Sequence, residues 1–162
     1  MIEFERILVP LDFSPSAQHA LSVAVCFSRH FGSCIDLLHV LDGVTLDEQM
    51  AQLEERLDRL VPMIPTDVRH LVRVRLDSGD PAERICAMAR KLEENLIVMG
   101  RRGFADAAET SIGNVTARVK RNAHCVVICV DADNPVEAFD LMNLAMLHAA
   151  RQTEPRRRAA GT

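Results

Sequence analysis

Short runs of apolar residues recur along the chain, separated by polar or amphipathic stretches. Most of these runs are too short for a buried helix, which favours buried strands. One run instead alternates apolar and polar residues, which indicates a strand with one wet face. The predicted strands are residues 4–10 (FERILVP), 34–41 (CIDLLHVL), 68–76 (VRHLVRVRL, the alternating run), 96–99 (LIVM) and 125–130 (CVVICV).

Between these strands, apolar residues recur at helical spacing. Ser14 followed by Pro15 is typical of a helix N-cap with proline at the first helical position, and Gly32 would close that helix. Asp80 and Pro81 begin a capping box, in which a carboxylate three residues after the cap reaches back to it. The predicted helices are residues 15–31, 46–60, 80–93 and 112–122.

Strands that alternate with helices in this way predict a parallel sheet covered on both faces by right-handed crossovers. Ligands of such sheets bind beyond the carboxyl ends of the strands, where the strand order reverses. The positions that follow each predicted strand are therefore the candidates for a site: Pro10 and Asp12, residues 40–42, residues 78–80, and the long loop after Met99.

Composition and charge exclude several classes of protein. The chain has 162 residues, of which 48% are hydrophobic and 26% charged, and this is typical of a globular domain. A net charge of −4 and the absence of Trp and Tyr argue against nucleic-acid binding. No apolar run is long enough to span a membrane, and the start, MIEFERILVPLDF, lacks the pattern of a secretory signal. We therefore expect a cytoplasmic protein that binds neither nucleic acid nor membranes.

Cysteine and histidine give no sign of a metal or redox site. The 5 cysteines form no CxxC pair, which favours reduced thiols that pack as small hydrophobes. The 6 histidines are scattered and form no HExxH motif, so the sequence assigns no metal ligand.

The loop after residue 99 carries the strongest candidate chemistry. Gly100 and Gly103 flank two arginines, and Gly113 follows after nine residues, at the start of a predicted helix. Glycines let the backbone turn sharply and approach a ligand without a Cβ clash. The amides at 113–116 would lie at the positive end of the helix, which suits an anion such as a polyphosphate.

The same loop has a plainer interpretation, which the sequence leaves open. The glycines could simply end a strand, ease a loop and start a helix. Arg101 and Arg102 could neutralise phosphate oxygens or lie in a solvated loop. The segment is not a Walker loop, because no GKS or GKT is present. Its glycines at 100, 103 and 113 also do not match the GxGxxG dinucleotide fingerprint.

Three segments together resemble the universal stress protein family. They are ILVPLDFSPSAQHAL, GDPAERI, and NLIVMG-RRG with nine residues before GNVTARV and five before CVVICV. The similarity covers about residues 4–131. It implies a flavodoxin-like (Rossmann-like) three-layer α/β sandwich with a five-stranded parallel sheet of order 3-2-1-4-5, within the adenine nucleotide alpha-hydrolase-like superfamily. We expect this domain over residues 1–133, a C-terminal helical extension over 134–150 and a disordered basic tail over 151–162.

The resemblance also implies a nucleotide site. Some family members bind ATP through Gly-x-x-Gly, nine residues, and then Gly-Ser or Gly-Thr. Position 114 departs from this pattern, because Asn114 can donate a hydrogen bond but offers no hydroxyl ligand; Thr116 keeps a hydroxyl nearby. Asp12 matches the acid that contacts the nucleotide, although it could instead be a second turn-forming cap beside Ser14. The residues implied to bind the nucleotide are Pro10, Asp12, Val40 (in the adenine pocket), Met99, Gly100, Arg102, Gly103, Gly113, Asn114, Val115 and Thr116.

The leading hypothesis for function is a non-enzymatic stress-response or signalling module that binds ATP with Mg, or carries AMP or ADP as purified. Two alternatives stay open: a slow ATP hydrolase, and a family member that has lost nucleotide binding and works through unknown protein partners. No catalytic residue is assigned. The resemblance implies a homodimer that pairs the edges of the strand over 125–130. The apolar segment 136–150 is expected to be buried in the same dimer, because its apolar face is too wide for a helix lying on one surface.

Overall fold

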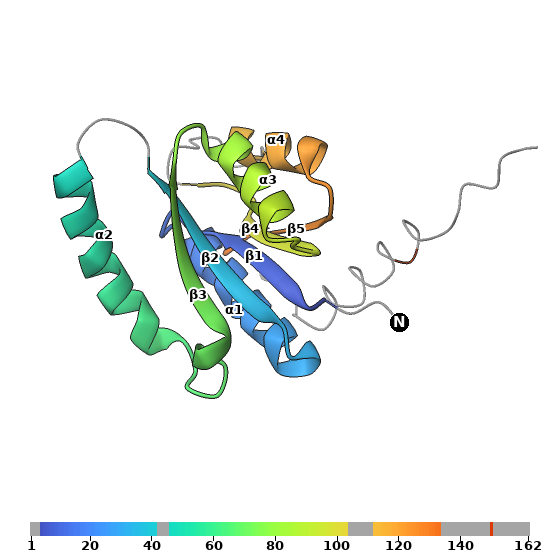
Figure 1. The fold of residues 1–162 in the computed structure, drawn as a ribbon, viewed down its shortest axis with the longest axis horizontal. Coiled ribbons are helices and arrows are strands. Elements are labelled where there is room, and N and C mark those ends of the chain that lie inside the picture. Colours follow the sequence, from blue (N-terminus) through green and yellow to red (C-terminus); the bar gives the residue numbers. More distant parts are fainter. Residues whose placement is uncertain (1–3, 42–45, 104–111, 134–149, 151–162) are drawn as a thin grey trace, which may run out of the picture.

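Strands and helices alternate along the part of the chain that the structure describes (Figure 1). This computed structural model describes residues 4–41, 46–103, 112–133 and 150. Short 3-10 turns at 61–63 and 69–71 lie between the second helix and the third strand. The elements are β1 (Arg6–Pro10), α1 (Pro15–Phe31), β2 (Cys34–Leu41), α2 (Leu46–Leu60), β3 (Val72–Ser78), α3 (Pro81–Lys91), β4 (Leu96–Gly100), α4 (Asn114–Asn122) and β5 (Val126–Val130).

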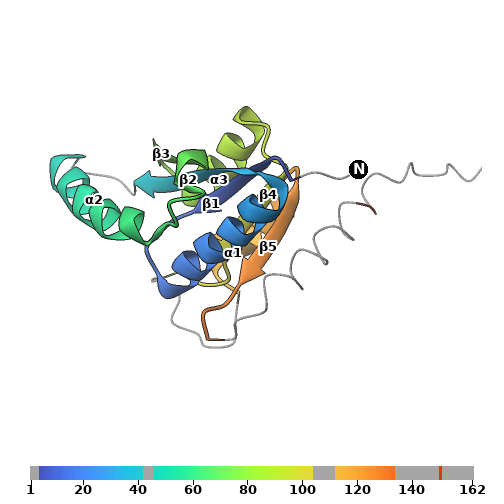
Figure 2. The same cartoon turned by 90° about the horizontal axis from the view of Figure 1, so that it is seen from below.

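The strands form one parallel sheet of order β3-β2-β1-β4-β5. β1 lies between β2 and β4, so the strand order reverses at this point of the sheet. Figure 2 shows α1 on one face of the sheet and α3 on the opposite face. The fold class predicted from the sequence, an α/β sandwich with order 3-2-1-4-5, is confirmed.

Each face of the sheet buries its own layer of apolar side chains, because successive residues of a strand point to opposite faces. Leu8, Leu38, Ile97 and Met99 pack against α3 and α4. The residues between them in the chain face α1, and fully burying one such side chain stabilises the fold by about 1.5–3 kcal/mol. The strand residues on the α1 face include Ile7, Val9, Ile35, Leu37, Leu96, Val98, Val126, Ile128 and Val130.

Two helices begin with N-caps at the residues that the sequence predicted, although of the predicted capping box only the bond to the Asp80 carboxylate is present among the described residues. The hydroxyl of Ser14 accepts a hydrogen bond from the N–H of Ala17 at 3.2 Å, and Gly32 ends α1 in the left-handed conformation with φ 72°. The carboxylate of Asp80 accepts from the N–H of Glu83 at 3.0 Å at the start of α3. None of the helices within the described ranges is both long enough and apolar enough to cross a bilayer.

Several element boundaries differ from the sequence prediction. The strand predicted over 68–76 spans Val72–Ser78, because pairing with β2 fixes its length: Val72 lies opposite Ile35 and Ser78 opposite Leu41. The first strand begins at Arg6, the third helix ends at Lys91, and the helix predicted over 112–122 begins at Asn114. Of the predicted C-terminal extension and tail, residues 134–149 and 151–162 lie outside the described residues.

β3 is also exposed to solvent on the face that the sequence predicted to be buried. Val74 and Leu76 are 42% and 41% exposed, whereas Arg75 turns to the other face and bonds with Asp36. α2 stands away from β3 in Figure 1 and packs through buried Leu53 and Leu60. The alternation of apolar and polar residues therefore predicted a strand correctly. It did not predict how far Val74 and Leu76 are buried, because that depends on where α2 packs.

Candidate functional site

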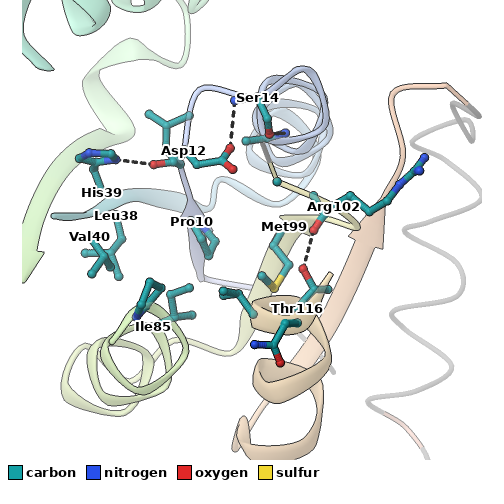
Figure 3. A pocket seen from close by; sticks show the side chains of 17 residues that line it. Pro10, Asp12, Ser14, Leu38, His39, Val40, Ile85, Met99, Arg102 and Thr116 are labelled. Carbon is teal, nitrogen blue, oxygen red and sulfur yellow. Dashed lines mark hydrogen bonds between the residues drawn. The ribbon is translucent and has the colours of Figure 1, made fainter. Parts of the chain in front are cut away.

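A cavity of about 480 Å³ opens at the carboxyl ends of β1, β2 and β4 (Figure 3). This is the place where the strand order reverses, and where ligands of open α/β sheets bind. Of the residues predicted for the site, all but Gly113 line it. They are Pro10, Asp12, Val40, Met99, Gly100, Arg102, Gly103, Asn114, Val115 and Thr116.

The cavity also contains residues that the sequence analysis missed. Pro81 and Ile85 come from the first turns of α3, and Leu38 and His39 come from β2. Periodicity and spacing do not indicate that these residues share a site, because α3 reaches the cavity only by packing across the sheet. The segment GDPAERI contains both α3 residues, and its resemblance to the family was the signal that could have found them.

One end of the cavity is apolar. Val40 and Ile85 face each other across it in Figure 3, with Pro10 and Met99 between this end and α4. A flat, weakly polar ring would fit between such side chains with little loss of hydrogen bonding to water.

The opposite end is the N-terminus of α4. The first N–H groups of a helix have no acceptor within the helix, and they carry its positive dipole. The residue at the N-cap of α4, Gly113, has no side chain to cap them, in contrast to Ser14 at α1 and Asp80 at α3. An anion that entered the cavity would therefore meet the N–H groups of residues 114–116.

The N–H group of Gly113, at the start of α4, is not free as the sequence predicted. Gly113 was expected to present a free amide to a ligand, but its N–H donates to the carbonyl of Arg101 at 2.8 Å. Thr116 is likewise used within the fold, because its hydroxyl donates to the carbonyl of Gly100 at 2.9 Å and the residue is buried. These two bonds join the helix start to the end of β4.

Gly100 is required by packing as well as by position. A Cβ at residue 100 would lie 2.8 Å from the Cβ of Ser16 and 3.1 Å from the nitrogen of Ala17. Real Cβ atoms do not approach that closely, so glycine lets the end of β4 lie against the first turn of α1. Glycine at residue 100 is therefore needed for the packing of β4 against α1, besides any close approach of a ligand.

Asp12 has the structural role that the sequence left open, and it also lines the cavity. Its carboxylate accepts a hydrogen bond from the N–H of Ser14 at 2.9 Å, which shapes the turn into α1. Nearby, the Nδ1 atom of His39 lies 2.6 Å from the carbonyl oxygen of Leu11, so the imidazole joins β2 to this turn (Figure 3). The histidine thus helps to position the residues that follow β1.

Arg102 lines the cavity, but its guanidinium group has carboxylate partners. Its Nη2 lies 3.3 Å from Asp131 and 3.7 Å from Asp133, beyond the end of β5. Figure 3 shows the side chain directed away from the centre of the cavity. Arg101 is exposed and does not line the cavity, and its backbone N–H donates to the carbonyl of Val130.

An ion pair joins the two helices that border the cavity. The Nη1 atom of Arg118 on α4 lies 2.9 Å from the carboxylate of Asp80, which caps α3. The hydrogen bond from Arg118 holds the pKa of Asp80 below its ordinary value. Because both groups are partly exposed, the pair fixes the relative position of the helices more than it stabilises the fold.

The thiols and acids of the described ranges offer no preformed metal site. Within those ranges no group of three His, Cys, Asp or Glu side chains could hold an ion. Burial raises the pKa of the Cys125 thiol to about 12 and raises the pKa of Cys86 and Cys129, which disfavours the reactive thiolate.

Comparison with known proteins identifies the family. The sequence model of the universal stress protein family matches residues 3–131. Universal stress protein MJ0531 of Methanocaldococcus jannaschii is 25% identical over 139 residues, which is 78% of this chain and 82% of that protein. The solved structure of the hypothetical protein MJ0577 is similar with a TM-score of 0.68 and 26% identity, over 83% of this chain and 100% of that one.

A third similarity concerns a protein solved with a ligand. The structure of the universal stress protein from Archaeoglobus fulgidus in complex with dAMP has a TM-score of 0.61 and 25% identity, over 80% of this chain and 99% of that one. The matched family, the parallel sheet and the relatives agree. The chain belongs to the universal stress protein family.

Proposed function

We propose that this chain binds adenine nucleotides, ATP with Mg among them, and acts as a non-enzymatic stress-response or signalling module in the cytoplasm. The observation that carries this proposal is the cavity at the carboxyl edge of the sheet, which is apolar at one end and bordered at the other by the N-terminus of α4, whose N-cap is a glycine. The related protein from Archaeoglobus fulgidus, with dAMP bound, supports an adenine nucleotide as the ligand. The free cysteines of the chain are typical of a reducing compartment.

The two ends of the cavity suggest how the nucleotide lies. The phosphates would accept hydrogen bonds from the N–H groups of Asn114, Val115 and Thr116, where the helix dipole favours negative charge. The adenine would then lie at the apolar end, between Val40 and Ile85. Asp12, on the wall between these ends, would face the ribose.

The residues present fit a magnesium ion that arrives with the nucleotide. Mg²⁺ keeps several waters and is bound through one or two carboxylates together with substrate phosphates. Asp12 is the carboxylate among the residues lining the cavity. Because Asp12 would face the ribose, the phosphates and water would be the main ligands of the ion, and the described residues contain no cluster that would hold it without the nucleotide.

The proposal includes no turnover. The ionisable residues lining the cavity are Asp12, His39 and Arg102, and each is bonded to the main chain or to a carboxylate. No nucleophile with an adjacent general base lines the described part of the cavity. Slow hydrolysis is the alternative function. It predicts that the purified protein releases ADP when it is incubated with ATP.

We also propose that the protein is a homodimer. β5 is the last strand of the sheet order, so one of its edges is not paired within the described residues. Val127 and Cys129 on this strand remain partly exposed, and an apolar edge of this kind favours pairing with another chain.

The nucleotide proposal is tested by changing charge at the two ends of α4. Asn114→Asp places a carboxylate where the phosphates would bind, and acidic residues at a helix start do not destabilise the helix. Repulsion of about 1–4 kcal/mol should weaken binding of ATP at least fivefold in calorimetric titrations. The control Asn122→Asp makes the same change at the far end of α4 and should leave the affinity within twofold.

A third variant tests the departure from the family pattern. Asn114→Ser restores a hydroxyl and should bind ATP more tightly by about 1 kcal/mol, the scale of one net hydrogen bond. Equal affinity of the parent and Asn114→Asp for ATP would contradict the proposed position of the phosphates. A parent that binds none of ATP, ADP and AMP would overturn nucleotide binding altogether and favour the interaction module.

A further inference from the structure

A second cavity, which we call the side cavity, lies between the carboxyl end of β2 and α2. It has a volume of about 220 Å³. β2 and the turn before α1 contribute one wall and α2 contributes the other. The side cavity is lined by Phe13, His39, Val40, Leu41, Gln49, Gln52, Leu53 and Arg56.

The side cavity adjoins the apolar end of the nucleotide cavity. His39 and Val40 line both. Figure 3 shows these two residues at the end of the nucleotide cavity that is remote from Arg102 and Thr116. A group bound in the side cavity would therefore lie close to the uncharged end of a ligand whose phosphates meet α4.

Aromatic and apolar side chains form much of the lining of the side cavity. Phe13 and Leu53 are buried, and the ring of Phe13 lies 5.4 Å from that of His39. The guanidinium of Arg56 lies 5.5 Å from the centre of the Phe13 ring, in a cation–π contact. A cavity of about 150 Å³ is large enough for benzene, so the volume of the side cavity admits a benzyl-sized ring, although His39, Gln49, Gln52 and Arg56 make part of its lining polar.

The backbone at Phe13 is held in an uncommon conformation. Its φ of 64° lies in the left-handed region, which bulky side chains rarely adopt. The neighbours of Phe13, Asp12 and Ser14, line the nucleotide cavity, whereas Phe13 itself lines the side cavity. The turn after β1 thus contributes to both cavities, and residues held in such conformations cluster at ligand sites.

We propose that the side cavity binds an aromatic substituent on the adenine ring, so that the ligands of this chain include base-substituted adenine nucleotides. This inference rests on the proposed function, because it needs the phosphates at α4 and the base beside Val40. The six-membered ring of adenine, with its 6-amino group, is the part of the nucleotide most remote from the sugar and phosphates. It is therefore the part that reaches the side cavity.

The experiment compares three monophosphates by calorimetry: AMP, N6-benzyl-AMP and 8-benzylamino-AMP. The last carries the same ring at C8, beside the sugar, and serves as the matched control ligand. The parent should bind N6-benzyl-AMP about tenfold more tightly than AMP, through burial of the ring and its contact with Phe13. It should bind 8-benzylamino-AMP no more tightly than AMP.

A variant that fills the side cavity completes the test. Gln52 lines the side cavity from the exposed surface of α2, so Gln52→Trp adds volume there without changing the core. This variant should bind AMP like the parent but lose the tenfold gain for N6-benzyl-AMP, whereas Gln52→Ala should keep it.

The outcomes separate this inference from the proposed function. If AMP binds but the N6-benzyl group gives no gain, or gives a gain that Gln52→Trp leaves unchanged, the side cavity is not a subsite and nucleotide binding stands. An equal gain for the C8 substituent would mean nonspecific adsorption and would also overturn the inference. If neither AMP nor N6-benzyl-AMP binds, the inference fails, and the titrations with ATP and ADP decide whether the proposed function fails as well.

Discussion

At the scale of single residues, Glu94 stands out because it is an acid buried in the core. Its side chain has no exposed surface, and neither carboxylate oxygen accepts a hydrogen bond from the described residues. The nearest cation, Arg6, is 3.9 Å away and bonds more closely with Asp36, which also accepts from Arg75 at 2.7 Å. Burial, together with the neighbouring carboxylate of Asp36, raises the pKa of Glu94 to about 8. The folded protein therefore holds a proton on Glu94 at neutral pH, where it can be shared with Asp36.

This proton makes stability depend on pH with a definite sign. The pKa of Glu94 rises from an ordinary 4.5 to about 8 on folding, so between these values the folded state binds a proton that the unfolded state has lost. The free energy of unfolding should fall as pH rises across this window, by up to about 1.4 kcal/mol per pH unit, and level off above it.

Glu94→Gln tests this account. Glutamine keeps the shape and hydrogen-bond donor of the protonated acid but does not titrate. Chemical denaturation between pH 5 and 9 should show a flatter dependence for this variant than for the parent. Glu93→Gln, one residue earlier and exposed, is the matched control and should keep the slope of the parent. Parallel profiles for Glu94→Gln and the parent would show that Glu94 is already ionised in the folded protein.

At the scale of elements, the contact between the end of β4 and the start of α1 orders the site. The N-cap Ser14 and the first turn of α1, with Ala17, line the nucleotide cavity, and β4 contributes Met99 and Gly100. The two elements can lie this close only because residue 100 has no side chain.

Gly100→Ala should therefore destabilise the protein by about 1–3 kcal/mol, the usual effect of overpacking a well-packed contact. The added Cβ would lie 2.8 Å from that of Ser16, and main-chain atoms at 3.1 Å limit how far the neighbours can move. Thermal denaturation of the parent, Gly100→Ala, Ser16→Gly and the double variant forms a double-mutant cycle. Partial recovery in the double variant supports this contact, and simple additivity of the two losses would contradict it.

At the scale of the whole molecule, the sheet has two edges of different character. β3, the edge strand at one side, contains Arg73 and Arg75, and charged side chains on an edge strand disfavour pairing with another strand, whereas β5 is apolar. The dimer proposed above therefore uses β5, and the apolar segment 136–150 is expected from its sequence to be buried in the same interface.

Truncation after Asp133 tests this expectation. The variant should keep nucleotide affinity, because the residues lining the nucleotide cavity precede this point, but it should dimerise more weakly or aggregate. Sedimentation analysis at micromolar concentration measures the change. Truncation after Pro155, which removes only residues 156–162 of the basic tail, is the control and should remain dimeric. A protein ending at Asp133 that stays soluble and dimeric would assign the extension another role.

Local physics determined what the sequence alone could predict. The caps at Ser14 and Asp80 depend on neighbouring residues, so both helices start where the sequence placed them. β2 was predicted with its observed bounds, since a mostly apolar run that follows Gly32 and Ser33 and ends before Asp42 leaves little choice. The order of the strands indicated the edge of the sheet that holds the site, and the resemblance to the family implied its residues, of which ten of eleven line one cavity.

The tertiary structure decided how those residues are used, because their partners lie far away in the chain. Gly113 and Thr116 bond back to Arg101 and Gly100, and Arg102 pairs with Asp131. Ile85 enters the nucleotide cavity only because α3 packs across the sheet, and the burial of β3 depended on the position of α2. Periodicity and spacing describe which face a residue is on, whereas long-range packing decides which groups meet there.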